Sequence, residues 1–272
     1  MKSITVVVHG ALGKMGREVA AAICRDPDLE MVGAVDIQAA GDHLPLPDAS
    51  RQVPLSSDLS SLLEACHPDV LVDFTIAEAA MSAARIATKQ GVNMVIGTSG
   101  LSDDGVREIE QLCLANKVGA VVAPNFALGA AVLLHLAKTA AKFFDHVEVI
   151  ELHHSEKADA PSGTALATAK AMLQSRGEPF VYAPTKKENL SGSRGGQIDG
   201  VAIHSVRLPG LVASQEVIFG APGQTLSLRH DTISRECYMP GVMLAVKQVV
   251  KRQGLVRGLD ALMNLGGNDE GV

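Results

Sequence analysis

Long runs of basic residues are missing from this sequence. Lysine and arginine together number 24 against 30 aspartates and glutamates, which gives a formal net charge of −6 at pH 7. Without a basic run, the chain is not expected to bind nucleic acid or an anionic membrane surface. Any small anionic ligand must therefore be bound by charge placed locally in a site.

Paired cysteine motifs and long apolar runs are missing as well. The four cysteines are scattered and none is spaced as Cys-x-x-Cys, which predicts reduced thiols rather than a disulfide framework or a zinc site. No apolar stretch approaches the ~20 residues of a membrane span, and the N-terminus enters a strand-like run rather than a signal peptide. We therefore expect a cytoplasmic protein with no membrane partner.

The first half of the chain alternates between strand-like and helical patterns. At 272 residues, 47% of them hydrophobic, the chain is long enough for one large domain or two modest ones. Alternation of this kind predicts an α/β fold with a parallel, doubly wound sheet. The predicted strands are 4–9, 31–35, 70–74, 94–96 and 120–123, and the predicted helices are 17–25, 58–65, 78–90 and 103–116. Residues 41–57, punctuated by Pro and Asp, are predicted to be a surface connection.

The pattern changes after residue 126. A long apolar helix is predicted over 127–144, followed mainly by strands with one helix, 165–176, among them, which indicates a second, α+β domain. Residues 186–197, rich in Gly, Ser and charge, are predicted to form a mobile loop. The predicted strands are 147–153, 200–207, 215–219 and 225–230. Helices are again predicted over 240–252 and 259–265.

A glycine-rich turn follows the first predicted strand. Gly10, Gly13 and Gly16 form Gly-x-x-Gly-x-x-Gly between that strand and a helix, a variant of the dinucleotide-binding fingerprint. Asp36 ends the next strand, 20 residues after Gly16, where an acidic residue binds a ribose hydroxyl in such folds. The turns after three later strands, at 74–75, 97–100 and 124–126, share the ligand-binding edge of the predicted sheet. The combination favours a cofactor site, although each turn alone is also an ordinary connection.

Chemistry concentrates in residues 151–165, Glu-Leu-His-His-Ser-Glu-Lys-Ala-Asp-Ala-Pro-Ser-Gly-Thr-Ala. A strand delivers His153 and His154 to its end, and Ser162 is a predicted N-cap, so the N–H groups of Gly163 and Thr164 can bind an anion. Histidine titrates near neutral pH, and Lys157 adds positive charge. The stretch predicts a site where a small anionic substrate receives a proton. Two alternatives remain: a structural histidine pair, and metal ligation with Glu151.

The same stretch closely resembles the signature of the dihydrodipicolinate reductase family. Further motifs occur in that family's order, so the resemblance covers essentially the whole chain. The His-His-to-Gly-Thr block is highly specific, whereas the glycine-rich loop is not. These further motifs are residues 10–17, Asp73-Phe74-Thr75, Ile96-Gly97-Thr98-Ser99-Gly100, Ala123-Pro124-Asn125-Phe126 and Ser234-Arg235.

The resemblance implies a fold, an assembly and a reaction. It implies a Rossmann domain of residues 1–126 and 236–272, and an inserted domain of residues 127–235 with a mixed open sheet that binds substrate and forms a homotetramer. It also implies NAD(P)H-dependent reduction of the dicarboxylate 4-hydroxy-tetrahydrodipicolinate to tetrahydrodipicolinate with loss of water, in lysine and diaminopimelate biosynthesis. No metal is expected.

Residue roles follow from the matched motif positions. His153 would be the proton donor, and Lys157 a second proton donor or acceptor. His154, Gly163 and Thr164 would bind the substrate. The cofactor would be lined by Gly10, Ala11, Leu12, Gly13, Lys14, Met15, Asp36, Gly97, Thr98, Ser99, Ala123, Pro124, Asn125 and Phe126.

One departure from the family pattern bears on the cofactor. Asp36 is followed by Ile37, where family members that use NADPH well often have an arginine for the 2′-phosphate. We therefore expect a preference for NADH, with NADPH still possible because Lys14 lies nearby in the sequence. Two other hypotheses remain: a nicotinamide-dependent dehydrogenase of another small amino or keto acid, and a non-catalytic NAD-sensing module with structural histidines.

Overall fold

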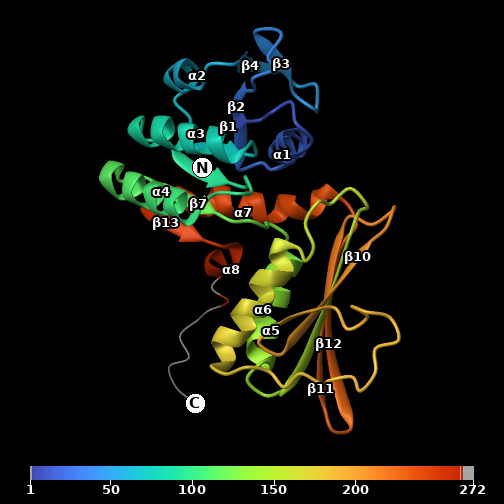
Figure 1. The fold of residues 1–272 in the computed structure, drawn as a ribbon. Coiled ribbons are helices and arrows are strands. Elements are labelled where there is room, and N and C mark those ends of the chain that lie inside the picture. Colours follow the sequence, from blue (N-terminus) through green and yellow to red (C-terminus); the bar gives the residue numbers. More distant parts are fainter. Residues whose placement is uncertain (1, 264, 266–272) are drawn as a thin grey trace. The chain divides into compact units, whose positions relative to one another are not determined.

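The computed structural model describes residues 2–263 and 265, and the chain divides into two compact units (Figure 1). Among the described residues, the first unit contains the chain up to Phe126 and again from Tyr238 to Met263, with Leu265. The second unit is the intervening segment, Ala127–Cys237. The second unit is therefore an insertion in the sequence of the first.

The first unit is built on a sheet of parallel strands. The strand order is β13-β7-β6-β5-β1-β2-β4-β3, and every neighbouring pair is parallel except β3 and β4. The chain runs outward from β1 to β2 on one side and then returns to β5 on the other, so β1 and β5 flank the topological switch point. The strands are β1 (Ile4–His9), β2 (Leu29–Val35), β3 (His43–Pro45), β4 (Gln52–Ser56), β5 (Val70–Asp73), β6 (Asn93–Ile96), β7 (Gly119–Val122) and β13 (Gly254–Arg257).

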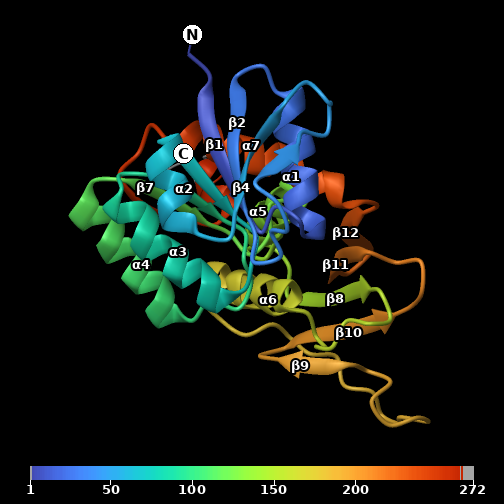
Figure 2. The ribbon, with the colours of Figure 1, turned by 90° about the horizontal axis from the view of Figure 1, so that it is seen from above.

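Helices cover both faces of this sheet (Figures 1 and 2). On one face, α2, α3 and α4 pack their apolar sides on the strands, and this core includes Leu63, Ala84, Ile109, Leu71 and Met94. Helix α1 packs on β1 and β2, and α7 on β5, β6 and β7. The predicted doubly wound α/β fold is confirmed. The helices are α1 (Lys14–Arg25), α2 (Leu59–Cys66), α3 (Ala77–Lys89), α4 (Asp103–Asn116), α7 (Met239–Val249) and α8 (Leu259–Leu262), with a short 3-10 helix η1 (Arg235–Tyr238) before α7.

The glycine-rich turn joins β1 to α1 through close backbone contacts. Gly10 has φ +79°, and a Cβ atom there would meet the carbonyl oxygen of Phe74 at 2.8 Å. At Gly16 a Cβ atom would lie 2.1 Å from the carbonyl oxygen of Gly10. Only glycine fits both positions. Helix α1 begins at Lys14, three residues before the predicted start, because the turn itself supplies the first helical residues.

The structure of the first unit departs from the predictions in three places. Residues 41–57 are not merely a connection, since they contain β3 and β4, and β4 pairs in parallel with β2. This strand was not predicted because Pro54 is unfavourable within a strand and the apolar alternation is short, although Val53 and Leu55 are buried. Strand β13 was also missed, because its four residues follow a polar turn and gain their pairing only from β7. The helix predicted over 259–265 ends at Leu262, and position 264 lies outside the described residues.

The second unit is a mixed sheet with helices α5 and α6 on one face. The strand order is β12-β11-β8-β10-β9, in which β8 and β10 are parallel and the other neighbours antiparallel. Val149, Val217 and Phe219 of the sheet pack with Ala137 of α5 and Met172 of α6 in one core. The predicted mixed open sheet is confirmed. The elements are α5 (Leu128–Ala140), β8 (His146–His153), α6 (Gly163–Arg176), β9 (Gly196–Ile198), β10 (Val201–Arg207), β11 (Ala213–Ala221) and β12 (Gln224–Thr232).

Helix α6 has the predicted N-cap and the predicted last residue, Arg176, but it begins at Gly163, two residues before the predicted start. Ser162 is the N-cap, and its hydroxyl accepts the backbone N–H of Ala165 at 3.2 Å. Gly177 closes the helix in the left-handed conformation at φ 81°. The predicted loop 186–197 is mostly without regular structure, but its last two residues belong to β9.

Candidate active site

A pocket in the first unit follows the glycine-rich turn. Its volume is about 300 Å³, and it lies at the carboxyl ends of β1, β2 and β5. Parallel sheets bind ligands at this edge, at the switch point of the strand order. Four predicted cofactor residues, Gly10, Leu12, Gly13 and Asp36, therefore share one pocket. The lining residues are His9, Gly10, Leu12, Gly13, Asp36, Ile37, Gln38, Thr75, Ile76 and Ala79.

Asp36 is held in place by the backbone around it. One carboxylate oxygen accepts the N–H of Leu12 at 2.9 Å, and the other accepts the N–H of Gln38 at 2.9 Å. The residue is only 8% exposed, whereas its neighbour Ile37 is 88% exposed. Asp36 therefore links the glycine-rich turn to the end of β2 and presents an oriented acceptor to the pocket.

The remaining predicted cofactor residues lie along the same edge of the sheet. Ala11 is buried in the turn. Lys14 and Met15 begin α1; Lys14 is exposed and Met15 is half-buried. Gly97, Thr98 and Ser99 follow β6, and Ala123, Pro124, Asn125 and Phe126 follow β7. The turn after β7 contacts the turn after β5, since the rings of Phe74 and Phe126 lie 5.9 Å apart, and the turn after β6 contacts it through the hydroxyl of Thr98, which accepts the N–H of Thr75 at 2.8 Å.

A buried polar cluster at this edge was not predicted from the sequence. His9 Nδ1 lies 2.6 Å from the carboxylate of Asp73, which also accepts the hydroxyl of Thr98 at 2.5 Å and that of Thr75 at 3.0 Å. The cluster connects the ends of β1, β5 and β6. Since His9 and Asp73 are 64 residues apart, only the parallel register brings them together.

The chemistry of this pocket fits a dinucleotide. The turn leads directly into α1, and the first N–H groups of a helix have no partner within it, so a pyrophosphate can bind at the start of α1 as it does in this type of turn. Asp36 matches the acceptor for a ribose diol. These residues belong to the first unit alone, so the fit depends on no other part of the chain.

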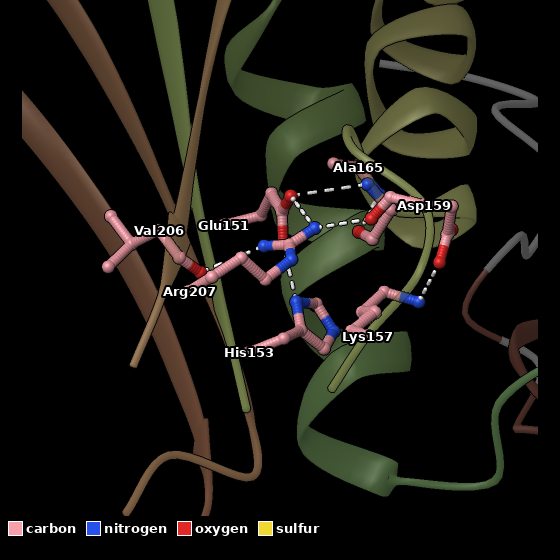
Figure 3. A network of polar contacts seen from close by, with 8 residues as sticks. Glu151, His153, Lys157, Asp159, Ala165, Val206 and Arg207 are labelled. Atoms are coloured by element: carbon pink, nitrogen blue, oxygen red, sulfur yellow. Dashed lines mark hydrogen bonds and ion pairs between the residues drawn. The ribbon is translucent and has the colours of Figure 1, made fainter. Parts of the chain in front are cut away.

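His153 is the half-buried member of the histidine pair in the second unit. Its side chain is 14% exposed, and its Nδ1 lies 2.5 Å from Oε2 of Glu151 (Figure 3). Both residues point to the helix-covered face of β8, as Val147 and Val149 do, because alternate strand residues share a face. His154 follows the strand and is exposed. The two histidines therefore have different environments.

Lys157 lies in the loop between β8 and α6. Its ammonium group contacts the carboxylate of Asp159 at 2.7 Å (Figure 3). Gly163 and Thr164 form the first turn of α6 and are exposed, and nothing lies within 4 Å of the position a Cβ atom would take at Gly163. The structure thus places Lys157 and the N-terminus of α6 in one loop-and-helix segment, together with Asp159, whose carboxylate also accepts a hydrogen bond from the backbone of Gly163.

Glu151 and Arg207 complete this group; from the sequence, Glu151 was considered only as an alternative metal ligand, and Arg207 was not among the predicted site residues. The Glu151 side chain is fully buried, and Arg207 contacts both of its oxygens, Nη2 to Oε1 at 2.8 Å and Nη1 to Oε2 at 3.0 Å. The sequence did contain a pattern that could have identified Glu151. It continues the core-facing alternation of Val147 and Val149, and an acid buried at such a position needs a charged or hydrogen-bonding partner. Arg207 had no such pattern, because only the register of β10 beside β8 places it opposite His153.

Burial and charge shift the pKa values of this group in definite directions. Burial is the largest influence on Glu151 and raises its pKa, but hydrogen bonds from Arg207, Ser205 and His153 bring the pKa below the ordinary value. The pKa of His153 is lowered, first by burial and further by the charges of Lys157 and Arg207, against the opposing effect of Glu151. Glu151 is therefore ionised at neutral pH, and His153 readily gives up its proton.

Within the described part of the chain, no group of three or more His, Cys, Asp or Glu is placed to hold a metal ion. Over the same residues, no helix has the length and apolar character needed to cross a membrane.

Comparison with known families agrees with this geometry. The model for the N-terminal part of dihydrodipicolinate reductase matches residues 4–126, and the model for its C-terminal part matches residues 129–263. The chain belongs to the dihydrodipicolinate reductase family. Members of this family bind a nicotinamide cofactor, NADH or NADPH. In the sequence, the boundary between the two matched segments falls within three residues of Phe126, the last residue of the first segment of the first unit.

Individual relatives support membership of this reductase family over the whole chain. A 4-hydroxy-tetrahydrodipicolinate reductase from Dehalococcoides mccartyi is 58% identical over 265 residues, covering 97% of this chain and 100% of the relative. One from Moorella thermoacetica is 48% identical, covering 96% and 98%. The dipicolinate-bound dihydrodipicolinate reductase from Paenisporosarcina sp. TG-14 is 39% identical, with a TM-score of 0.85 and coverage of 95% and 98%.

The fold extends beyond the dihydrodipicolinate reductases. An amine dehydrogenase from Mycobacterium smegmatis has a TM-score of 0.67 at 18% identity, covering 95% of each chain. At that identity the likeness shows a shared fold only.

Proposed function

We propose that this protein catalyses the NAD(P)H-dependent reduction of 4-hydroxy-tetrahydrodipicolinate to tetrahydrodipicolinate, with loss of water, in lysine and diaminopimelate biosynthesis. The observation that carries the proposal is the group around His153, in which an imidazole, an ammonium and a helix N-terminus lie in one segment. Family membership over essentially the whole chain supports the same reaction.

The substrate is a ring with two carboxylates, and the second unit offers groups suited to bind them. The N–H groups of Gly163 and Thr164 lie in the first turn of α6, where a carboxylate is favoured. Lys157 supplies a positive charge and His154 an exposed imidazole. A relative in this family has been solved with dipicolinate bound, which supports a dicarboxylate ligand for this chain as well.

Proton transfer is assigned to His153. The reaction consumes substrate, NAD(P)H and one proton, and it yields tetrahydrodipicolinate, NAD(P)⁺ and water. The cofactor supplies the hydride. Because Nδ1 of His153 is bonded to Glu151, Nε2 is the atom that can give a proton to the substrate. Lys157 acts as a second proton donor or acceptor, or as a fixed charge that stabilises the bound carboxylate.

NADH is the proposed preferred cofactor, with NADPH still accepted. Asp36 is fixed as an acceptor for a ribose diol, and its charge opposes a 2′-phosphate at the same place. The exposed neighbour, Ile37, brings no positive charge to the pocket. Lys14 begins α1 and is exposed, so it remains available to a phosphate.

A homotetramer in the cytoplasm completes the proposal. Among the described strands, β12 has a neighbour on one side only, and most of its residues are exposed, so the sheet of the second unit can extend into a partner copy. The four scattered cysteines are all free, as suits a reducing compartment.

An assay of turnover with substrate made by dihydrodipicolinate synthase tests the function directly. Purified protein is mixed with NADH, and the product of dihydrodipicolinate synthase is then added while NADH absorbance is followed. We expect NADH oxidation only after that addition, because the enzyme needs the cyclic dicarboxylate. NADH binding without oxidation would favour an NAD-sensing module, and oxidation with other amino or keto acids alone would favour a different dehydrogenase.

A further inference from the structure

The carboxylate of Glu151 is saturated with hydrogen-bond donors. Oε2 accepts from His153 Nδ1 at 2.5 Å and from Arg207 Nη1 at 3.0 Å, while Oε1 accepts from Arg207 Nη2 at 2.8 Å and from the N–H of Ser162 at 3.3 Å. Figure 3 shows the side chains of Glu151, Arg207 and His153 gathered together, with Glu151 above the other two in the view. An ionised carboxylate only accepts hydrogen bonds, so the Nδ1 of His153 carries its proton in both the neutral and the charged ring.

Arg207 is itself held in a fixed orientation. Besides Glu151, it donates to the backbone carbonyl oxygens of Val206 at 2.8 Å and Asp159 at 2.6 Å. Its Nε is buried and has no partner among the described residues. A buried ion pair with an unpaired N–H contributes little to stability by itself. The arrangement is better explained by what it does to the neighbouring imidazole.

We propose that Glu151 and Arg207 are positioning residues that fix the tautomer of His153 and balance its affinity for the proton. This inference rests on the proton-donor role proposed for His153. Glu151 favours the imidazolium, and without it a half-buried ring would stay neutral and could not act as an imidazolium acid. Arg207 offsets the carboxylate, and without it the imidazolium would hold its proton too tightly. The pair leaves Nε2 as the only ring nitrogen that exchanges a proton.

The charged groups around the ring are few and come from three segments. Glu151 lies on β8 and Arg207 on β10. Lys157 and Asp159 lie in the loop between β8 and α6. Strand β11 places Ala213 opposite His153, and α6 contributes Ser162 to the cluster, neither of which titrates in this range. Burial, together with the charges of Lys157 and Arg207, lowers the pKa of His153 against the opposing effect of Glu151, in agreement with this balance.

Two variants with opposite effects test the proposal. Glu151→Gln keeps an acceptor oxygen for Nδ1 but removes the negative charge, so the pKa of His153 should fall by about one unit or more. Arg207→Met removes the opposing charge, so that pKa should rise, by less than it falls in Glu151→Gln because Arg207 is the weaker influence on the ring. The pH profile of kcat/KM and an NMR titration of the imidazole nitrogens measure both shifts, with His153→Gln to assign the signal. If the pKa of His153 falls in Glu151→Gln and rises in Arg207→Met, the proposal is supported. If, in folded protein, the pKa shifts in the same direction in both variants or does not shift, the proposal is overturned.

Three further variants separate this effect from damage to the fold. Arg207→Lys restores a charge and should return the profile toward that of the unchanged protein. The double variant Glu151→Gln with Arg207→Met leaves no buried charge unpaired, so it should fold and titrate between the two single variants. Glu148→Gln is the matched control, because Glu148 also lies on β8 and binds an arginine and a histidine, Arg194 and His204, apart from the site. It should leave the pH profile unchanged.

The readouts also distinguish this inference from the proposed function. The NMR titration reports the proton affinity of His153 without turnover, so it is informative even if the reductase assay is negative. Thermal unfolding and NADH affinity show whether each variant is folded. If the enzyme is active but the pKa of His153 is unchanged in both Glu151→Gln and Arg207→Met, this inference is overturned and the proposed function is not affected.

Discussion

The exposed side chain of Ile37 tests the basis of cofactor choice at a single residue. Ile37→Arg places a guanidinium next to Asp36, where it can bind a 2′-phosphate and offset the carboxylate. One charge-assisted hydrogen bond should raise kcat/KM for NADPH relative to NADH by about tenfold or more. Steady-state kinetics with both cofactors measure this ratio, and an unchanged ratio would show that position 37 does not face the phosphate.

His153 and Lys157 carry the chemistry in the proposed mechanism. His153→Gln and Lys157→Ala should each lower turnover by about 100-fold or more while leaving NADH affinity unchanged, as expected for groups that serve proton transfer or substrate charge. Glu156→Gln, an exposed change in the same loop, is the control and should keep normal turnover. Near-normal turnover in either variant would show that the role assigned to that residue is wrong.

At this scale the sequence identifies residues that are close along the chain better than their distant partners. His153, Lys157 and Gly163 are recognisable because one short segment contains them. Arg207 lies 56 residues beyond Glu151, and only strand register brings the two together. The roles of the predicted site residues stay predictions until variants are measured.

Among the elements, the turn between β1 and α1 depends most on glycine. Gly16→Ala forces a Cβ atom to within 2.1 Å of the Gly10 carbonyl oxygen, so the turn and α1 must separate. We expect a loss of stability of about 2 kcal/mol, as for overpacking elsewhere, with weaker NADH binding. Gly41→Ala is the control, since nothing lies within 4 Å of that Cβ position. Thermal unfolding and NADH titration measure both effects, and equal behaviour of the two variants would contradict this account.

Most elements of the fold follow from local patterns. The predicted bounds of β1 and α4 agree with the structure, because β1 is a β-branched run and α4 has a Ser102 cap with two acids in its first turn. Strands β4 and β13 were missed because their stability comes from neighbours rather than from their own sequence. Short strands at the sides of a sheet carry too little local pattern to be recognised.

For the whole molecule, the free edge of β12 bears on assembly. If this edge joins partner copies, a charge placed on it should oppose pairing. Leu226→Lys should therefore shift the tetramer toward smaller species in sedimentation or light scattering, while Leu190→Lys, also an exposed leucine of the second unit, should not. A mass that Leu226→Lys leaves unchanged would show that β12 lies outside the interface, and a wild-type monomer would exclude the tetramer.

Lys157 already holds one carboxylate, that of Asp159, at 2.7 Å. A ligand that takes this place exchanges one anionic partner for another, so its Coulombic gain is only the difference between two similar ion pairs. Acetate and citrate present the same chemical group and should compete weakly with the substrate. Buffers free of carboxylates should accordingly give the lower apparent KM, and the choice of buffer becomes part of any comparison between preparations.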